Sequence, residues 1–338
     1  MTGPVSSRAR VDGMVDSSGR RIDYVRLSVT DRCNLRCTYC MAESMSFLPR
    51  RELLTLEELA QLAAHLVARG VRRIRLTGGE PLVRRGIGEL VEALGLLRGA
   101  GLDELSITTN GTRLPEFAAR LAKAGIQRVN VSLDTLEAAG FAAITRGGDV
   151  EQVLAGITAA RAAGLAVKIN MVALKGVNDD EFAGMLAWCG GHGFDLSLIE
   201  TMPLGDVATA RADRYLPLSV ARQALEARYT LIPSTYRTGG PSRYFDVVET
   251  GTRVGFITPL SGNFCAACNR IRVSATGTVY GCLGHDQKVE LREIMRSGAP
   301  GGLDAALDEL LAGKPARHEF DIARARPAVA RHMSVTGG

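Results

Sequence analysis

Between Tyr24 and Met202, short β-branched runs alternate with longer Ala- and Leu-rich stretches. The runs are predicted to be six strands, at 24–30, 71–77, 104–110, 127–133, 166–174 and 194–202. The stretches between them have helical periodicity, at 55–69, 87–99, 113–124, 150–163 and 179–191. Strands that alternate with crossover helices form a parallel sheet, which predicts an α/β protein. Six such units can build a barrel or an open sheet, and both bind ligands at the carboxyl ends of the strands.

After Met202 this alternation ends. We expect an irregular connection at 203–217, helices at 218–228, 289–297 and 302–312, and strands at 244–248, 253–258, 270–274 and 278–281. The polar first residues are typical of a flexible tail. The predicted organisation is therefore a flexible N-terminal tail at 1–20, an α/β domain at 21–215, an extension at 216–330 and a C-terminal tail at 331–338 that ends in Gly-Gly.

Composition excludes two classes of protein. No apolar run approaches the roughly 18 residues that a membrane span needs, and the N-terminus lacks the apolar segment of a secretory signal. A cytoplasmic protein without a membrane partner is therefore expected. The seven cysteines cluster as three, one and three, at 33, 37, 40, 189, 265, 268 and 282. This pattern is unlike a disulfide framework and typical of metal ligands, with Cys189 as a core residue.

The first triad, Cys33, Cys37 and Cys40, directly follows the first predicted strand. Zinc sites use four ligands, and nothing near this triad supplies the fourth. Iron–sulfur clusters are held by closely spaced cysteines, and three thiolates on a four-iron cluster leave one iron open for another ligand. The spacing therefore favours a [4Fe–4S] cluster with one open iron.

The second triad, Cys265, Cys268 and Cys282, leaves two alternatives open. His285 follows in "CLGH" and would complete a Cys3His zinc ribbon, which fits that ligand set well. The other alternative is a second three-thiol cluster, in a chain that already carries one such site. Both alternatives place a metal centre in the extension.

Cations interrupt several predicted strands. They are Arg26, Arg73, Arg75, Lys168, Arg270 and Arg272. Two pairs of arginines are spaced two residues apart, so the members of each pair point to one face of their strand. Because both faces of a parallel sheet are usually covered, buried cations without an anionic partner would be costly there. A triphosphate would supply that anion through bidentate arginine contacts.

The spacing CxxxCxxC, with an aromatic residue before the last cysteine, resembles the signature of the radical S-adenosylmethionine (SAM) superfamily. In that superfamily the open iron of the cluster binds the methionine part of SAM, and reduction of SAM yields a 5′-deoxyadenosyl radical. The resemblance implies that Cys33, Cys37 and Cys40 are metal ligands. It also implies SAM contacts from Tyr39, from Gly78, Gly79 and Glu80 of "TGGEP", and from the strand-end residues Ser132 and Met202.

The stretch "CNRIRVSATG" at 268–277 resembles the GTP 3′,8-cyclases of molybdenum cofactor biosynthesis. The resemblance implies that Cys265, Cys268 and Cys282 hold a second [4Fe–4S] cluster, whose open iron binds the guanine of GTP, and that His285 is a bystander. It implies GTP contacts from Arg26, Arg75, Thr108, Lys168, Arg270 and Arg272. The last two arginines are also implied in catalysis, as residues that assist the final reduction. A C-terminal Gly-Gly that threads back into the active site completes the resemblance.

The expectation is therefore a partial (β/α)6 TIM-like barrel, whose C-terminal extension carries a second Fe–S cluster. It would be a lyase that converts GTP to (8S)-3′,8-cyclo-7,8-dihydroguanosine 5′-triphosphate. The implied partners are an electron donor such as flavodoxin or ferredoxin, the cyclic pyranopterin monophosphate synthase that takes the product, and a second copy in a homodimer. Stable nucleic-acid binding is not expected.

Two other functions stay open on the sequence. A radical SAM peptide-maturation enzyme would share the first triad, although such extensions usually carry more than three cysteines. A nucleic-acid-binding protein with a zinc ribbon at 265–285 would contain zinc, and its binding would depend on salt.

Overall fold

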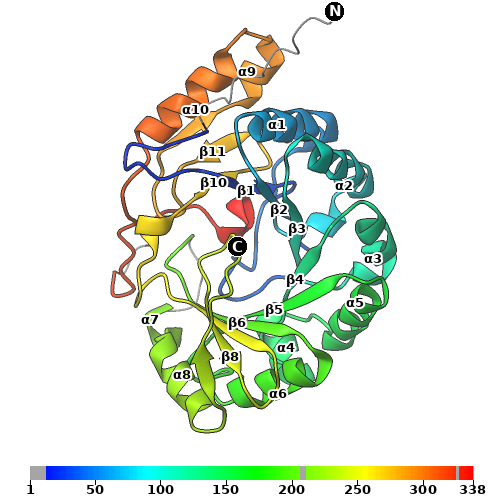
Figure 1. The fold of residues 1–338 in the computed structure, drawn as a ribbon, viewed down its shortest axis with the longest axis vertical. Helices are drawn as coiled ribbons and strands as arrows, with labels where there is room; N and C mark the ends of the chain where they lie inside the picture. The colour runs from blue at the N-terminus through cyan, green and yellow to red at the C-terminus, as the bar shows by residue number, and fades with distance from the viewer. Residues whose placement is uncertain (1–12, 206–210, 325–326, 338) are drawn as a thin grey trace, which may run out of the picture.

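Six parallel strands form as predicted, each pairing with the next along the chain. The computed structural model describes residues 13–205, 211–324 and 327–337 (Figure 1). The strands are β1 (Tyr24–Ser28), β2 (Arg73–Thr77), β3 (Glu104–Thr109), β4 (Arg128–Ser132), β5 (Ala166–Ala173) and β6 (Asp195–Glu200). They form the curved wall of a partial barrel (Figure 1), so the predicted fold is confirmed.

Helices cover the outer face of this sheet (Figure 1). The predicted ones are α1 (Leu56–Ala68), α2 (Ile87–Leu96), α3 (Leu114–Lys123), α5 (Val150–Ala162) and α6 (Phe182–His192). The side chain of Thr55 caps α1 in a capping box with Glu58, as the sequence "TLEEL" predicts. The core lies between sheet and helices, where strand residues such as Leu27 pack with helix residues such as Leu62. Of the α-helices between these strands, α4 (Ala138–Thr145) was not predicted.

The extension continues the sheet at both of its edges. Its strands are β7 (Leu231–Pro233), β8 (Arg243–Val247), β9 (Arg253–Ile257), β10 (Arg270–Val273), β11 (Thr278–Tyr280) and β12 (Lys288–Glu290). The sheet order is β12-β11-β10-β1-β2-β3-β4-β5-β6-β9-β8-β7. β10 runs parallel to β1 and β9 runs parallel to β6, so the extension lengthens the parallel part of the barrel wall on both sides.

The remaining helical elements connect these strands or follow them. They are η1 (Arg50–Glu52), η2 (Pro81–Val83), η3 (Leu97–Ala100), η4 (Cys265–Ala267), α7 (Arg211–Arg214), α8 (Leu218–Glu226), α9 (Arg292–Ser297), α10 (Gly302–Ala312) and α11 (Met333–Thr336). Across the described ranges, no helix combines the length and the apolar character needed to cross a membrane.

Some sequence-based boundaries differ from the structure. The helix predicted at 289–297 begins only at Arg292, because Val289 pairs with Val279 in the β11–β12 ladder. Residues 13–20, predicted as part of a flexible tail, are packed: Met14 is buried, and Asp16 accepts hydrogen bonds from the Ser18 and Arg20 N–H groups. Residues 1–12 of that tail lie outside the described ranges.

Along the barrel strands, apolar side chains alternate with polar ones. On β1, Val25 and Leu27 belong to the core under the helices, whereas Arg26 lies on the opposite face. Arg75 on β2 and Lys168 on β5 share that inner face, since the charge of Arg75 acts on both Arg26 and Lys168. We call the space enclosed by the inner face the lumen; it is lined mainly by polar side chains.

Candidate active site

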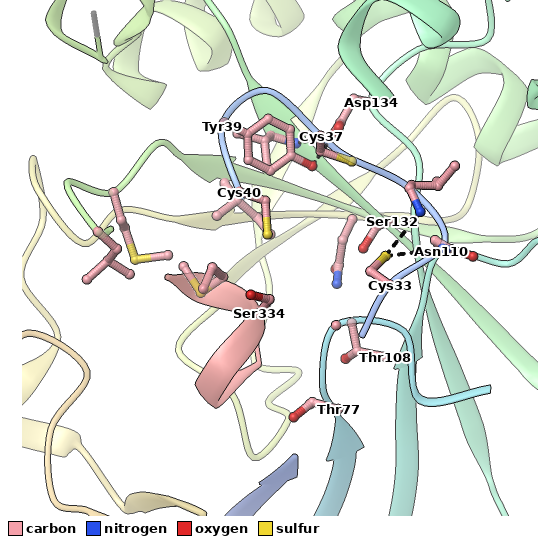
Figure 2. A pocket seen from close by; sticks show the side chains of 18 of the residues that line it. Cys33, Cys37, Tyr39, Cys40, Thr77, Thr108, Asn110, Ser132, Asp134 and Ser334 are labelled. Atoms are coloured by element: carbon pink, nitrogen blue, oxygen red, sulfur yellow. Dashed lines mark hydrogen bonds between the residues drawn. The ribbon is translucent and has the colours of Figure 1, made fainter. Parts of the chain in front are cut away.

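The first cysteine triad lies on the loop after β1, at the carboxyl end of the barrel (Figure 2). A tight turn brings two of its members together, since the Cys40 N–H donates to the Cys37 carbonyl oxygen at 3.0 Å. The Arg36 N–H donates to the Thr145 carbonyl oxygen at 3.1 Å. That bond ties the loop to the end of α4, so the helix that was not predicted positions the triad.

A pocket opens between this loop and the carboxyl ends of the strands. The three cysteines line it together with Thr108, Ser132 and Asp134 from the strand ends (Figure 2). The full set of predicted site residues that line it is Cys33, Cys37, Tyr39, Cys40, Gly78, Gly79, Thr108, Ser132 and Met202. The fold thus brings the three cysteines of the first triad and all but one of the predicted SAM contacts to one cavity.

Gly78 and Gly79 pack directly against the segment that leads into the cysteine loop. A Cβ atom on Gly78 would lie 2.5 Å from the Thr30 carbonyl oxygen, and one on Gly79 would overlap the Arg32 carbonyl oxygen. Only glycine permits so close an approach of two backbones. The two glycines therefore hold the entrance of the cysteine loop against the end of β2.

Glu80 is the predicted SAM contact that does not line the pocket. It is 1% exposed, and its carboxylate accepts hydrogen bonds from the Leu82 N–H, the Thr109 hydroxyl and the Asn110 N–H. Burial raises the pKa of Glu80 to about 7, although these hydrogen bonds act in the opposite direction. Glu80 thereby fixes the loop after β3, from which the Asn110 amide points to Cys33 Sγ at 3.8 Å.

Asp134 is a pocket residue that the sequence analysis missed. Its Oδ2 accepts a hydrogen bond from the Tyr39 hydroxyl at 2.7 Å, and its Oδ1 accepts one from the Val172 N–H at 2.8 Å. Burial raises the pKa of Asp134 to about 6. The carboxyl group anchors the cysteine loop to β5, and its place two residues after Ser132 in "VSLD" is the only sequence signal for it.

The first triad fits a cluster held by three thiolates. Burial raises the pKa of Cys33 to about 11 and that of Cys40 to about 12, so both free thiols are protonated near neutral pH. Metal binding displaces such protons, because the thiolate is the ligand. Three thiols around a pocket that polar residues such as Ser132 and apolar residues such as Met202 also line suit a cluster with one iron left for another ligand.

The second triad lies at the opposite end of the barrel. Asn269, which separates Cys268 from β10, accepts backbone hydrogen bonds from Asp23 and Tyr24 at the amino end of β1. β11 is antiparallel to β10, so the end of β11 lies beside the start of β10. Cys282 follows the end of β11 and therefore lies at the same end of the barrel as Cys268. The two triads thus lie at the two ends of the lumen.

Two cations that the sequence analysis missed surround the second triad. Lys314 is 3% exposed, and its Nζ lies 3.6 Å from Cys268 Sγ. Arg20 donates to the Cys265 carbonyl oxygen at 3.0 Å. Burial opposes ionisation of Cys268, but the charges of Arg270 and Lys314 bring its pKa below the usual value. Three thiols beside cations fit a group that is held through thiolates.

His285 contacts the chain beyond the triad. Its Nε2 lies 3.1 Å from the Arg317 carbonyl oxygen. Within residues 13–205, 211–324 and 327–337, no three His, Cys, Asp or Glu side chains converge as the ligands of a single metal ion do. A four-iron cluster does not require its ligands to converge on one ion.

Five of the predicted GTP contacts meet inside the lumen. They are Arg26, Arg75, Lys168, Arg270 and Arg272, and none of them forms an ion pair with a carboxylate of the described chain. Burial, with the repulsion from Arg75 and Arg270, lowers the pKa of Arg26 to about 10. The buried Nε atoms of Arg26 and Arg270 have no hydrogen-bond partner among the described residues. Such a group of buried, mutually repelling cations fits a polyanionic ligand.

Other cations of the barrel strands are neutralised by the protein itself. Their ion pairs are Arg73–Asp23 at 2.8 Å, Arg128–Glu104 at 2.5 Å and Arg253–Asp195 at 3.1 Å. Arg73 and Arg75 share a strand face in the sequence, yet only Arg73 has a carboxylate partner. The unpaired charge is therefore confined to one part of the lumen.

The C-terminal helix α11 lies inside the barrel, next to β1 (Figure 1). Met333 and Ser334 of α11 line the pocket. Arg272 donates a hydrogen bond to the Gly337 carbonyl oxygen. Gly337 has a φ of +72°, and a Cβ atom there would overlap the Thr77 side chain. Gly338, the second glycine of the predicted pair, lies outside the described ranges.

Comparisons with known proteins agree with this geometry. One family model, Radical SAM superfamily, matches residues 27–189, and another, Molybdenum Cofactor Synthesis C, matches residues 194–320. The GTP 3′,8-cyclase of Erythrobacter litoralis (strain HTCC2594) is 57% identical over 96% of this chain and 98% of its own length. That of Agrobacterium fabrum (strain C58 / ATCC 33970) is 56% identical over 96% of this chain and 94% of its own length.

The solved structures that resemble this chain are similar to it in fold but not in sequence. Streptococcus suis SuiB bound to S-adenosylmethionine superposes with a TM-score of 0.58 at 14% sequence identity, over 81% of this chain and 62% of that chain. Native anSMEcpe with bound AdoMet superposes with a TM-score of 0.54 at 18% identity, over 77% of this chain and 74% of that chain. The partial barrel is thus found in proteins whose sequences differ widely from this one.

Proposed function

The chain belongs to the GTP 3′,8-cyclase family of radical SAM enzymes, and we propose that it converts GTP to (8S)-3′,8-cyclo-7,8-dihydroguanosine 5′-triphosphate. This reaction is the first step of molybdenum cofactor biosynthesis. The observation that carries the proposal is the group of unpaired cations in a lumen with a cysteine triad at each end. A nucleoside triphosphate supplies the negative charge that this group lacks.

At the carboxyl end of the barrel, Cys33, Cys37 and Cys40 would hold a [4Fe–4S] cluster with SAM beside it. When bound and reduced, this centre supplies the radical chemistry that removes the C3′ hydrogen of GTP. The pocket residues that would orient SAM are Tyr39, Gly78, Gly79, Ser132 and Met202. Glu80 would act from behind the pocket, by fixing the loop that carries Asn110.

At the amino end, Cys265, Cys268 and Cys282 would hold a second [4Fe–4S] cluster next to the guanine of GTP. Substrate contacts would come from Arg26, Arg75, Thr108, Lys168, Arg270 and Arg272. Thr108 is available for this role because its hydroxyl oxygen is buried and has no partner in the described chain. Arg270 and Arg272 lie on β10, which begins two residues after Cys268 of the second triad, so they could also assist the final reduction. The C-terminal residues Met333 and Ser334, which line the pocket, would exclude water from it.

The proposal extends beyond the single chain. We expect an electron donor such as flavodoxin or ferredoxin, and we expect the product to pass to the cyclic pyranopterin monophosphate synthase. The protein would act in the cytoplasm, and it would form a homodimer. Within the chain, residues 21–215 would form the radical SAM barrel, 216–330 the auxiliary-cluster extension and 331–338 the tail that enters the lumen.

Anaerobic analysis of iron, sulfide and zinc after cluster reconstitution tests the two-cluster proposal. We expect about eight irons per chain, and about four after Cys268→Ser. About four irons with one zinc would support the zinc ribbon instead. In the same preparation, GTP should stimulate formation of 5′-deoxyadenosine. Stimulation by a peptide but not by GTP would favour the peptide-maturation alternative.

A further inference from the structure

A tyrosine from the extension holds one of the lumen cations. Lys168 is 6% exposed, and its Nζ donates a hydrogen bond to the Tyr244 hydroxyl at 2.6 Å. Tyr244 lies on β8 and is 2% exposed. Its ring centroid lies 5.0 Å from the same Nζ, so the ring adds a cation–π contact. Since no carboxylate of the described chain pairs with Lys168, the phenol is the group that orients its ammonium.

The Tyr244 hydroxyl belongs to a small buried network. The side chains of Thr238 and Ser242 also hydrogen-bond to it. Burial opposes ionisation of the phenol, but the charge of Lys168 and the hydrogen bonds with Lys168, Thr238 and Ser242 together bring the pKa of Tyr244 below its usual value. Tyr244 can therefore accept a hydrogen bond from Lys168 while its own proton is directed to Thr238 or Ser242.

One glycine makes room for this network, and a second lets the same segment approach β2. Tyr244 pairs with Gly255 of β9, where a Cβ atom would lie 2.9 Å from the Tyr244 ring and would overlap the Ser242 hydroxyl oxygen. A Cβ atom on Gly239 would lie 2.6 Å from Cδ of Arg73, on β2. The segment 238–244 of the extension therefore reaches the inner face of the barrel and forms part of the lumen wall.

We propose that Tyr244 is a positioning residue for GTP, which holds the Lys168 ammonium where it meets a phosphate of the substrate. This inference rests on the proposed function, because Lys168 needs such a partner only if a nucleoside triphosphate enters the lumen. Arg75 and Arg128 repel Lys168, and the nearest strand-register carboxylate, Asp195, is already paired with Arg253. Without the phenol, nothing in the described chain would counter that repulsion.

Tyr244→Phe tests the proposal, because it removes the hydroxyl and keeps the ring in place. We expect the KM for GTP to rise roughly tenfold, as the loss of a charge-assisted hydrogen bond predicts, with kcat within about twofold of the wild-type value. The Kd for GTP, measured by equilibrium dialysis without SAM, should rise by the same factor. Burial lowers the pKa of Lys168, and the Tyr244 hydroxyl raises it. Without the hydroxyl, Lys168 should lose its proton at a lower pH. The KM for GTP should therefore begin to rise at a lower pH in the variant than in the wild type.

Tyr229→Phe is the matched control. Tyr229 also belongs to the extension and donates from its phenol to the Ala183 carbonyl oxygen at 3.2 Å, away from the lumen. The Tyr229→Phe variant should therefore have the same KM and Kd for GTP as the wild type. A KM within twofold of wild type for Tyr244→Phe would overturn the inference, and so would a fall in kcat at unchanged KM, which is what a merely structural role predicts. A wild-type enzyme that turns over no GTP would instead contradict the proposed function.

Discussion

Arg270 illustrates how a single side chain is prepared for an anion without a carboxylate partner. Its guanidinium lies 5.9 Å from the centroid of the Tyr24 ring and 5.7 Å from that of Phe264, and its buried Nε has no partner in the described chain. Aromatic contacts thus orient the charge and leave its hydrogen bonds available. We expect Arg270→Ala to lower GTP conversion by roughly tenfold or more, while slow SAM cleavage without GTP continues.

Arg120→Ala is the control for that variant, because Arg120 lies on the outside of α3 and pairs with Glu92. Product and 5′-deoxyadenosine should be quantified together for both variants. An unchanged rate and an unchanged GTP affinity for Arg270→Ala would remove Arg270 from the set of substrate contacts.

Glu80 makes folding depend on pH in a defined direction. Its pKa rises from the ordinary value of 4.5 to about 7 because the carboxyl group is buried. Below pH 4.5 the carboxyl group is protonated in both the folded and the unfolded protein. Between pH 4.5 and 7 it ionises in the unfolded chain but stays protonated in the folded one. The free energy of unfolding therefore falls as the pH rises through this range. Glu80→Gln should flatten the fall in unfolding free energy between pH 4.5 and 7, which is at most about 1.4 kcal/mol per pH unit.

Denaturant unfolding at several pH values between 4.5 and 7.5 measures this effect. Glu116→Gln serves as the control, because Glu116 is 57% exposed on α3. If the unfolding free energy of Glu80→Gln fell with pH as steeply as that of the wild type, Glu80 would not be the cause of the pH dependence.

Individual site residues were predictable where chemistry restricts the residue type. Clustered cysteines, glycines at a close backbone approach and cations within strands are visible in the sequence, and the structure brings most of them to the pocket or the lumen. Asp134 and Lys314 were not predictable. Each is a common polar residue whose role comes from its contacts, with Tyr39 and with Cys268, and those contacts join distant parts of the chain.

Among the elements, the strands and helices of the barrel were predictable because each has a clear hydrophobic period. α4 was missed because the stretch 138–145 is apolar on nearly all sides and lacks a helical stripe. The strand β12 was missed because only its pairing with β11 makes 288–290 extended. The placement of β9 and β10 beside β6 and β1 depends on tertiary pairing, which periodicity does not encode.

The C-terminal element gives a prediction of its own. Gly337→Ala would place a side chain at a φ of +72° and against Thr77. Because the tail would then leave the lumen, we expect GTP conversion to fall by roughly tenfold or more, given that the strain alone costs about 1–2 kcal/mol. The thermal midpoint should stay near the wild-type value, since the barrel core does not depend on the tail.

Gly298→Ala separates backbone strain from the loss of docking. Gly298 has a φ of +64°, but a Cβ atom there would meet open space. This control should lose some stability and keep normal turnover. Normal turnover in Gly337→Ala would contradict a role for the docked tail in GTP conversion.

In the whole molecule, the barrel and the extension together line the lumen. The barrel supplies the pocket beside the first triad, and the extension supplies the second triad, two lumen arginines and the Tyr244 network. That the triads lie at opposite ends of one lumen could not be predicted from the sequence, because it follows from the parallel pairing of β10 with β1. A substrate between them would be held from both sides.

The transfer of a hydrogen atom from GTP to SAM-derived 5′-deoxyadenosine tests this account most directly. Reconstituted enzyme should be incubated anaerobically with SAM, a reductant and GTP that carries deuterium at C3′. We expect one deuterium in the 5′-deoxyadenosine, formed together with the cyclised product. 5′-Deoxyadenosine that forms without deuterium, or at the same rate without GTP, would contradict the claim that the lumen presents the ribose of GTP to the radical centre.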